Sequence, residues 1–443
     1  MLLAVLSGFL VAALAPLVHR LQPRFGGWLL ALLPAALFIL FASHLRAVGH
    51  DGEVLLQSWQ WIPSLGIHLA FRLDGLSLLF ALLISGIGFF IVAYAGRYLK
   101  GHRDQARLYV LLLCFMASML GLVLSDNLIS LFVFWELTSI TSYLLVGFNH
   151  ASKPARLSAR QGLFVTVAGG LALMTGLVML GMVGGSYELS ELLTEREALT
   201  SHALYAPILL LIVIGAFTKS AQFPFHFWLP NAMAAPTPVS AYLHSATMVK
   251  AGVYLLARLQ PALGGTELWT AVLGLAGAFT MFLGVFLAVR STGIKRVLAY
   301  STVMALGTLT MLIGIGTELA LTAAMAFLLA HSLYKGALFL VAGIIDHETG
   351  SKDFLDTGGL GKAMPVTALF AGVAALSLGG IIPLFGFVAK ELMFEAVLDA
   401  PLFSGILATL AVASAVMGVT VAAIVGLKPW YGQRVETKKS PHE

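Results

Sequence analysis

The sequence has little charge. Asp, Glu, Lys and Arg together make up 11% of its 443 residues, and hydrophobic residues make up 59%. A soluble globular domain carries about 25% charged residues, so this composition excludes that class and predicts a polytopic membrane protein. Lys and Arg exceed Asp and Glu by 26 to 21. This excess does not indicate nucleic-acid binding, because the basic residues lie in short loops between apolar runs, where charge sets topology.

Cysteine is almost absent. The one cysteine, Cys114, lies in an apolar run, which excludes a disulfide framework and a thiolate metal site. The sequence also lacks a Walker A motif, a dinucleotide-binding fingerprint and a haem-attachment motif, so we expect no bound cofactor and no nucleotide hydrolysis or electron transfer by this chain. Lysines, which ligate metals poorly at neutral pH, accompany the buried histidines without a carboxylate cluster, and this disfavours a metal site.

Long apolar runs dominate what is present. Windows of about 20 apolar residues predict an all-α membrane protein with thirteen transmembrane spans. We expect the first to be a retained span rather than a signal peptide, because no basic residue precedes it. A polar stretch at 46–74, with Trp59 and Trp61, is expected to form an external loop at the membrane surface. The expected spans are 1–18, 27–45, 75–96, 108–124, 128–147, 162–184, 205–223, 239–257, 269–289, 297–316, 319–345, 366–398 and 403–427.

Loop charges predict the orientation. Most loop Lys and Arg residues fall on alternate loops that face inward if the N-terminus lies outside and the C-terminus inside. The loops assigned to the outside contain four basic residues, Arg46, Arg72, Arg196 and Arg258. This asymmetry predicts an odd number of spans, with a C-terminal tail in the cytoplasm.

Two spans are expected to be broken. The seventh carries Lys219 shortly before Pro224, and the twelfth carries Gly379, Gly380 and Pro383 before Lys390. Interruptions at corresponding places in two halves indicate an inverted repeat. We therefore expect spans 4–8 to repeat as spans 9–13. The expected division is 1–107 for the first three helices, 108–258 and 259–427 for the two repeats, and 428–443 for the tail.

Glu136 is the only acidic residue in the span 128–147. A charged side chain at that depth costs roughly 2.5–3.5 kcal/mol to insert, so we expect it to have a partner and a function. Burial favours the neutral form of Lys219 and a nearby carboxylate favours the charged form, so a Glu136–Lys219 pair would be switchable. The alternative is a static ion pair that joins two helices, although buried pairs stabilise proteins poorly.

Two further spans combine histidine with lysine. His244 and Lys250 are expected to share the eighth span, and His331 and Lys335 are four residues apart on one helix face. Histidine titrates near physiological pH, so these residues are candidates for a proton relay, although a buried histidine can also be a simple hydrogen-bonding residue. Lys390 is a candidate exit gate, or it extends to the membrane surface. Asp74, before the third span, is a candidate helix cap.

These residues resemble the antiporter-like subunits shared by respiratory complex I and the multisubunit Mrp-type Na+/H+ antiporters. The resemblance covers roughly residues 70–427. It rests on the segments 134–137, 219–226, 243–252 and 331–335, which read FWEL, KSAQFPFH, LHSATMVKAG and HSLYK. The family implies paired inverted repeats, a switchable pair of Glu136 and Lys219, a line continued by His244, Lys250, His331 and Lys335, and an end at Lys390.

Within the family, the sequence is most similar to the large A-type component of the Mrp antiporter. Segments 386–392 (GFVAKEL) and 428–432 (KPWYG) carry this similarity. A-type components continue well past the point where this sequence ends, which leaves three explanations: a fragment, a split gene product or an incompletely sequenced chain. We do not expect activity without partners.

The resemblance implies a non-enzymatic subunit of a Na+/H+ antiporter in a bacterial cell membrane, with other antiporter subunits and lipid as partners and Na+ and H+ as transported ions. The alternative is a proton-pumping membrane subunit of an NADH:quinone oxidoreductase or a related membrane hydrogenase.

Overall fold

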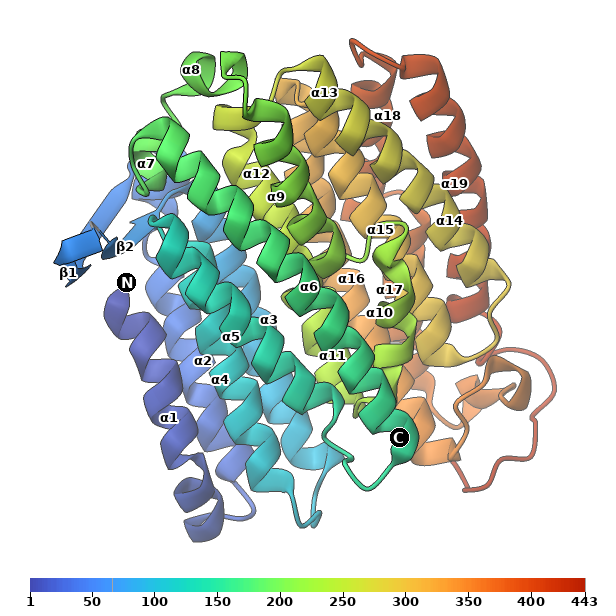
Figure 1. Ribbon diagram of the computed structural model, residues 1–443. Helices are drawn as coiled ribbons and strands as arrows, with labels where there is room; N and C mark the ends of the chain where they lie inside the picture. Colours follow the sequence, from blue (N-terminus) through green and yellow to red (C-terminus); the bar gives the residue numbers. More distant parts are fainter. Residues whose placement is uncertain (66, 443) are drawn as a thin grey trace. The chain divides into compact units, whose positions relative to one another are not determined.

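The computed structural model describes residues 1–65 and 67–442 and is a helical, polytopic membrane fold (Figure 1). In the described residues, nine helices are long and apolar enough to cross a membrane. Three shorter apolar helices accompany them: α2 (Gly26–Ala42), α9 (Tyr205–Lys219) and α17 (Pro365–Gly379). The chain divides into two compact units, the first formed by Met1–Lys219 with Ala234–Leu263 and the second by Ser220–Met233 with Gly264–Glu443.

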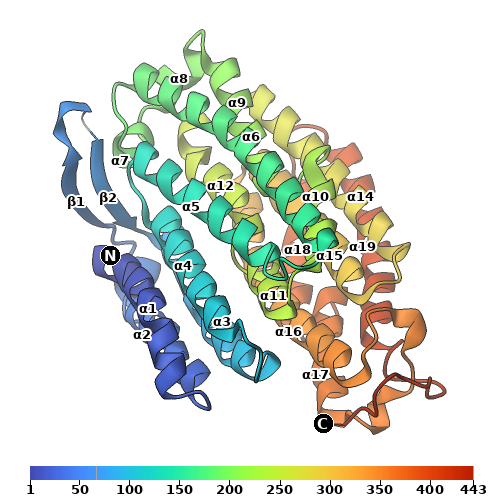
Figure 2. The same cartoon turned by 60° about the horizontal axis from the view of Figure 1, so that its bottom comes forward.

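Unit 1 is a bundle in which α3, α4, α5 and α6 run side by side and α9 packs on α6 (Figure 2). Besides α2 and α9, its principal helices are α1 (Leu2–Leu21), α3 (Gly75–Tyr98), α4 (Gln105–Leu124), α5 (Leu128–Val146), α6 (Lys153–Gly184), α11 (Thr237–Ser245) and α12 (Ala251–Leu263). Two short helices, α7 (Leu189–Leu192) and α8 (Arg196–Ser201), connect α6 to α9.

Unit 2 is built around the close pair α14 (Ala276–Val289) and α15 (Ile294–Ile315). A Cβ atom on Gly277 would overlap the backbone of Met311, and one on Gly307 would overlap the backbone of Met281. Small residues therefore let the two backbones approach, as is common between membrane helices. The unit also contains α10 (Trp228–Asn231), α13 (Glu267–Trp269), α16 (Glu318–Thr349), α17, α18 (Phe385–Leu398) and α19 (Ser404–Gly426).

Helices end where the proline and glycine pattern places the two interruptions. α9 ends at Lys219, and Ala221 follows with a φ of 48°. α17 ends at Gly379, and Gly380 takes the left-handed conformation with a φ of 74° before α18 begins. Glycine adopts this conformation without the steric cost that a Cβ atom brings.

The continuous eighth span predicted at 239–257 is wrong. α11 ends at Ser245 and α12 begins at Ala251, with Lys250 in a short 3-10 turn between them. His244 and Lys250 therefore lie on different elements. The interruption escaped the sequence analysis because no proline or glycine marks it; residues 246–249 are as apolar as the helices around them.

The predicted external loop contains a β-hairpin, which is a departure from the all-α expectation. β1 (Leu55–Ile62) pairs in antiparallel orientation with β2 (Ile67–Leu73). In β2, the apolar residues Ile67, Leu69, Phe71 and Leu73 alternate with His68, Ala70 and Arg72, which is the period of a half-buried strand. The hydropathy windows missed this pattern because they average over a length greater than a strand.

Asp74 caps α3, as predicted. Its side chain accepts a hydrogen bond from the backbone N–H of Ser77, and the Ser77 hydroxyl accepts one from the backbone N–H of Asp74. Asp74 also accepts hydrogen bonds from Arg258 and Arg72. The assignment of Arg258 to an external loop was wrong, because it lies in α12 and only 4% of its surface is exposed. Arg258 can be buried because it forms an ion pair with Asp74. The two residues are far apart in the sequence, so residue spacing does not reveal the pair.

Candidate functional site

Lys219 is the last residue of α9 and is fully buried. Its ammonium donates hydrogen bonds to the carbonyl oxygen of Trp135 (3.1 Å) and to the Ser139 hydroxyl (2.8 Å), both on α5. The ammonium also lies 5.0 Å from the centroid of the Trp135 ring, within cation–π distance. The Ser139 hydroxyl donates in turn to the Trp135 carbonyl at 3.3 Å, so three polar groups form a closed triangle.

Glu136 lies on α5 between the two residues that bind Lys219. It lies close enough to the Lys219 ammonium to attract it electrostatically. The Glu136 Oε1 atom is buried and has no hydrogen-bond partner within the described residues. It faces Gly170 of α6, where a Cβ atom would overlap it. The structure therefore brings Glu136 and Lys219 together, and Ser139 is the side chain to which Lys219 donates.

Unit 2 contains a second lysine–serine triangle. Lys335 of α16 is fully buried and donates to the Ser301 hydroxyl (2.6 Å) and, at 3.4 Å, to the carbonyl oxygen of Leu298, both on α15. The Ser301 hydroxyl donates to the same Leu298 carbonyl at 3.0 Å. The pattern of unit 1 is thus repeated: a buried ammonium on one helix binds a serine hydroxyl and the carbonyl one turn before it on another.

His331 lies on the same helix as Lys335, one turn earlier, and is fully buried. Its ring stacks on Phe327, with 6.5 Å between ring centroids, and meets Tyr334 edge-on at 5.4 Å. The predicted placement of His331 and Lys335 on one helix is observed.

His244 and Lys250 are also fully buried, near the break between α11 and α12. The break is held by side chains: the Thr247 hydroxyl donates to the Tyr242 carbonyl at 2.6 Å, and the Tyr242 hydroxyl donates to the carbonyl of Ile84 in α3 at 2.9 Å. Backbone at membrane depth can be irregular where protein satisfies its polar groups. The interruption thus places two ionisable side chains beside non-helical backbone inside unit 1.

Lys390 lies on α18, which packs against α16. Its ammonium donates to the carbonyl oxygen of Gly379 at 2.8 Å. Gly379 ends α17, so the positive charge lies at the negative end of a helix dipole and binds one of its free carbonyls. The break in the helix therefore supplies the polar partner that a lysine in an apolar bundle needs.

Sequence reasoning missed Ser139, Ser301 and Gly170. Ser139 is three residues after Glu136, on the same helix face, so its spacing was an available signal. For Ser301 and Gly170 the contact partners lie on other helices, and nothing local to either residue reveals them.

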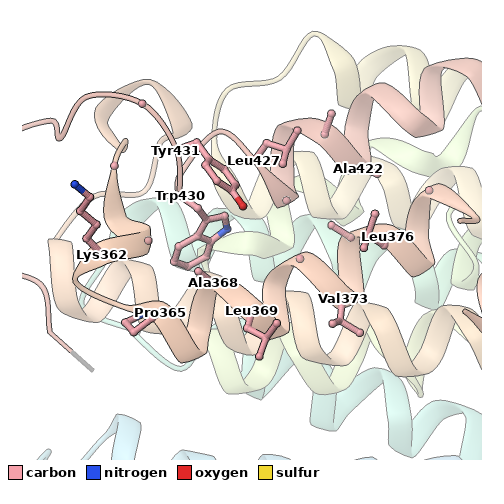
Figure 3. A pocket seen from close by; sticks show the side chains of 18 of the residues that line it. Lys362, Pro365, Ala368, Leu369, Val373, Leu376, Ala422, Leu427, Trp430 and Tyr431 are labelled. Carbon is pink, nitrogen blue, oxygen red and sulfur yellow. The ribbon is translucent and has the colours of Figure 1, made fainter.

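Across the described residues, no group of three or more His, Cys, Asp or Glu side chains could hold a metal ion. A cavity of about 950 Å³ lies in unit 2 between α17, α19 and the segment after α19 (Figure 3). Its wall is largely apolar, with Leu369, Leu376 and Trp430 among its residues, and none of the seven candidate residues lines it.

The fold and these residues define a polytopic helical membrane protein with ionisable side chains buried among its helices. Residues 125–418 match the family described as "NADH:quinone oxidoreductase/Mrp antiporter, TM", and the chain belongs to this family. Residues 59–109 match the family described as "NADH-Ubiquinone oxidoreductase (complex I), chain 5 N-terminus". The predicted family resemblance is confirmed.

Curated relatives bear the names of antiporter components. The chain is 44% identical to the A component of the Na(+)/H(+) antiporter of Bacillus subtilis over 89% of its own length and 51% of that protein. It is 49% identical to the A/B component of the probable K(+)/H(+) antiporter of Rhizobium meliloti over 79% of its own length and 35% of that protein. The chain thus spans about half or less of the length of these relatives.

Two solved structures are similar in fold. A chain of the Mrp complex from Dietzia sp. DQ12-45-1b superposes with a TM-score of 0.89 and 40% identity, over 97% of this chain and 48% of that one. A chain of the membrane-bound sulfane sulfur reductase, an archaeal respiratory membrane complex, superposes with a TM-score of 0.86 and 26% identity, over 99% of this chain and 72% of that one.

Proposed function

We propose that the chain is a subunit of a multisubunit monovalent cation (Na+)/proton antiporter, and that it moves protons through the membrane on buried ionisable side chains. The observation that carries the proposal is the lysine–serine triangle found in each unit. A fully buried ammonium bound by a hydroxyl and a carbonyl is costly to build, and in membrane proteins such residues mark ion pathways. The names of the relatives support the choice of antiport.

The proposed path uses residues of both units. In unit 1, Glu136 and Lys219 form the switchable pair, and His244 and Lys250 continue the relay. In unit 2, His331 and Lys335 carry the proton on, and Lys390 is the exit group. Lys335 is held by the neutral oxygens of Ser301 and Leu298, so loss of its proton would leave no unpaired carboxylate beside it. Lys219 differs, because the nearby Glu136 carboxylate favours its charged form. Movement of Glu136 or Lys219 relative to the other would thus change the protonation of Lys219.

The proposed architecture has thirteen spans, with spans 4–8 and 9–13 as inverted repeats at 108–258 and 259–427, after three helices at 1–107 and before a tail at 428–443. The helices that accept the lysines, α5 and α15, are equivalent spans in this scheme, which supports it. The donors are not equivalent, because Lys219 lies on span 7 and Lys335 on span 11. Lys219 corresponds instead to Lys390, and both lie at a helix break.

We place the protein in a bacterial cell membrane, with its N-terminus outside, its C-terminus in the cytoplasm, and other antiporter subunits and lipid around it. The basic loops support the orientation. The similarity to one chain of a solved Mrp complex supports the partnership with other subunits.

A proton-pumping membrane subunit of an NADH:quinone oxidoreductase or a related respiratory complex is the second candidate. The fold similarity to a chain of the sulfane sulfur reductase, at 26% identity, favours it. The two candidates differ in what drives the protons: a cation gradient in the first and electron transfer in the second.

The test is cation/proton exchange in inverted vesicles that carry the whole assembly, with wild type, Lys219→Ala and the control Lys362→Ala, an exposed lysine. An antiporter responds to added Na+ with a change in ΔpH in the absence of NADH. We expect the response to be lost in Lys219→Ala and kept in Lys362→Ala. A response that requires NADH or another electron donor would favour the second candidate, and an unaffected Lys219→Ala variant would exclude Lys219 from the path.

A further inference from the structure

A second cavity, of about 600 Å³, opens in unit 1 away from the buried lysines. Its lining residues come from the turn that joins α1 to α2, the turn that joins α3 to α4, and the adjoining helix ends. Both turns lie at the same end of these helices (Figure 2). Basic side chains dominate its wall, and no Asp or Glu is among its described lining residues. The basic residues are His19, Arg24, Arg97, Lys100 and His102.

Three cations of this cavity have no hydrogen-bond or ion-pair partner among the described residues. Arg24, Arg97 and Lys100 are exposed, and their side chains make no hydrogen bond or ion pair within the part of the chain that the structure describes. Three positive charges around one hollow attract an anion, and arginine in particular presents a planar fork of donors that fits phosphate oxygens.

Buried polar groups also line the same cavity. The Nδ1 atom of His19 is buried and has no hydrogen-bond partner among the described residues. Tyr109 is fully buried, and its hydroxyl accepts a hydrogen bond from Gln105 at 3.1 Å, which leaves its own proton to donate. Buried polar atoms normally have partners, so a free histidine nitrogen in a cationic hollow indicates a ligand with polar atoms.

The cavity opens beside an apolar surface. Phe25 and Trp28 line it and are 61% and 55% exposed, and Leu21 and Leu32 on the adjoining turns of α1 and α2 are 68% and 61% exposed. Aromatic residues of this kind gather where a membrane meets water. A ligand with an anionic head and long apolar chains would satisfy both surfaces.

We propose that this cavity binds the phosphate headgroup of an anionic phospholipid, with its acyl chains along the exposed faces of α1 and α2. Basic pockets between transmembrane helices on the cytoplasmic side are suited to such headgroups, and the predicted orientation places this end of the helices there. The proposal does not depend on the antiporter function.

The experiment measures lipid binding to the purified, delipidated assembly by native mass spectrometry, with phosphatidylglycerol and phosphatidylcholine as probes. The variant Arg24→Gln/Arg97→Gln removes two lining cations. The control Arg20→Gln/Arg103→Gln removes two exposed cations from the same turns that do not line the cavity. We expect a preference for phosphatidylglycerol that the first variant weakens about tenfold and the control leaves near wild type.

Equal weakening by both variants, or by neither, would overturn the proposal, because general surface charge or another site would then bind the lipid. Inorganic phosphate separates the two sources of a phosphate group: competition by phosphate at millimolar concentration as strong as that by phosphatidylglycerol would assign the cavity to a soluble anion. Trp28→Ala leaves every cation in place, so a correctly assembled Trp28→Ala variant should bind phosphatidylglycerol more weakly. Unchanged binding would contradict the proposed seating of the acyl chains.

Discussion

The ammonium of Lys219 donates to the Ser139 hydroxyl at 2.8 Å, and that hydroxyl lies on α5, the helix that also carries Glu136. Lys335 binds Ser301 in the same way at 2.6 Å. In both sites the buried ammonium donates a hydrogen bond to a neutral serine hydroxyl. This arrangement leads to the first prediction.

Ser139→Ala should lower the rate of cation/proton exchange. A hydrogen bond to a charged group contributes about 1.5–3 kcal/mol, which corresponds to roughly tenfold or more if the bond positions Lys219 for transfer. Ser142→Ala is the matched control, because Ser142 is also buried on α5 and, among the described residues, its hydroxyl donates to the backbone carbonyl of Ser139 and to no other group. Exchange measured in inverted vesicles should separate the two variants. Equal cation/proton exchange rates in Ser139→Ala and Ser142→Ala would mean that Ser139 has no specific role in proton transfer.

Gly170→Ala should displace Glu136. The added Cβ atom would overlap Glu136 Oε1, so the carboxylate or α6 must move, at a cost of about 1–3 kcal/mol in stability. We expect exchange to fall and the thermal unfolding temperature to drop. Gly372→Ala in α17 is the control, since no atom lies within 4 Å of its added Cβ, and alanine there should be neutral or stabilising. Full exchange in Gly170→Ala would show that the Glu136 position tolerates movement.

Stability should fall at acid pH through Asp74. Burial acts to raise the pKa of Asp74, but hydrogen bonds and positive charge from Arg258, together with Arg72, hold this pKa well below its usual range. A carboxyl with a depressed folded-state pKa contributes stability above its unfolded pKa, about 3.9, and loses it progressively as pH falls below that value. Wild type should therefore become less stable below about pH 4.

Asp74→Asn tests this account of acid sensitivity. Removing the carboxylate leaves Arg258 buried without its partner, which should cost about 3–5 kcal/mol near pH 7. The difference in stability between variant and wild type should shrink as pH falls below 4, because wild type then loses the same charge. Thermal unfolding of the assembly in detergent between pH 3 and 7 measures it. A difference that is constant over this range would contradict the role assigned to Asp74.

Lys390→Leu should abolish cation/proton exchange and destabilise the C-terminal end of α17. The substitution removes the ammonium that binds the Gly379 carbonyl, and an unpaired buried carbonyl costs about 1–3 kcal/mol. Hydrogen exchange of residues near 379 should therefore be faster. Glu391→Gln, a change at the exposed neighbour, should leave both measurements near wild type. Cation/proton exchange at the wild-type rate in Lys390→Leu would exclude Lys390 from the proposed path.

The sequence by itself determined the membrane class, the family, the interruption after Lys219, the interruption between α17 and α18, and the cap at Asp74. These features are local: apolar run length, short motifs, proline and glycine positions, and a residue type at a helix start each act within about one span. The seven candidate residues were also chosen from the sequence, because an ionisable side chain in an apolar run is conspicuous without any structure.

Tertiary structure decided the partners of those residues. Ser139 and Ser301 each accept a hydrogen bond from a lysine on another helix. Gly170 leaves space for the Glu136 carboxylate of the neighbouring helix. Arg258, which the sequence assigns to a loop, forms a buried ion pair with Asp74. The break before Lys250 likewise has no local marker. Such contacts depend on which helix faces are brought together, and hydropathy along one chain does not specify how apolar helices pack.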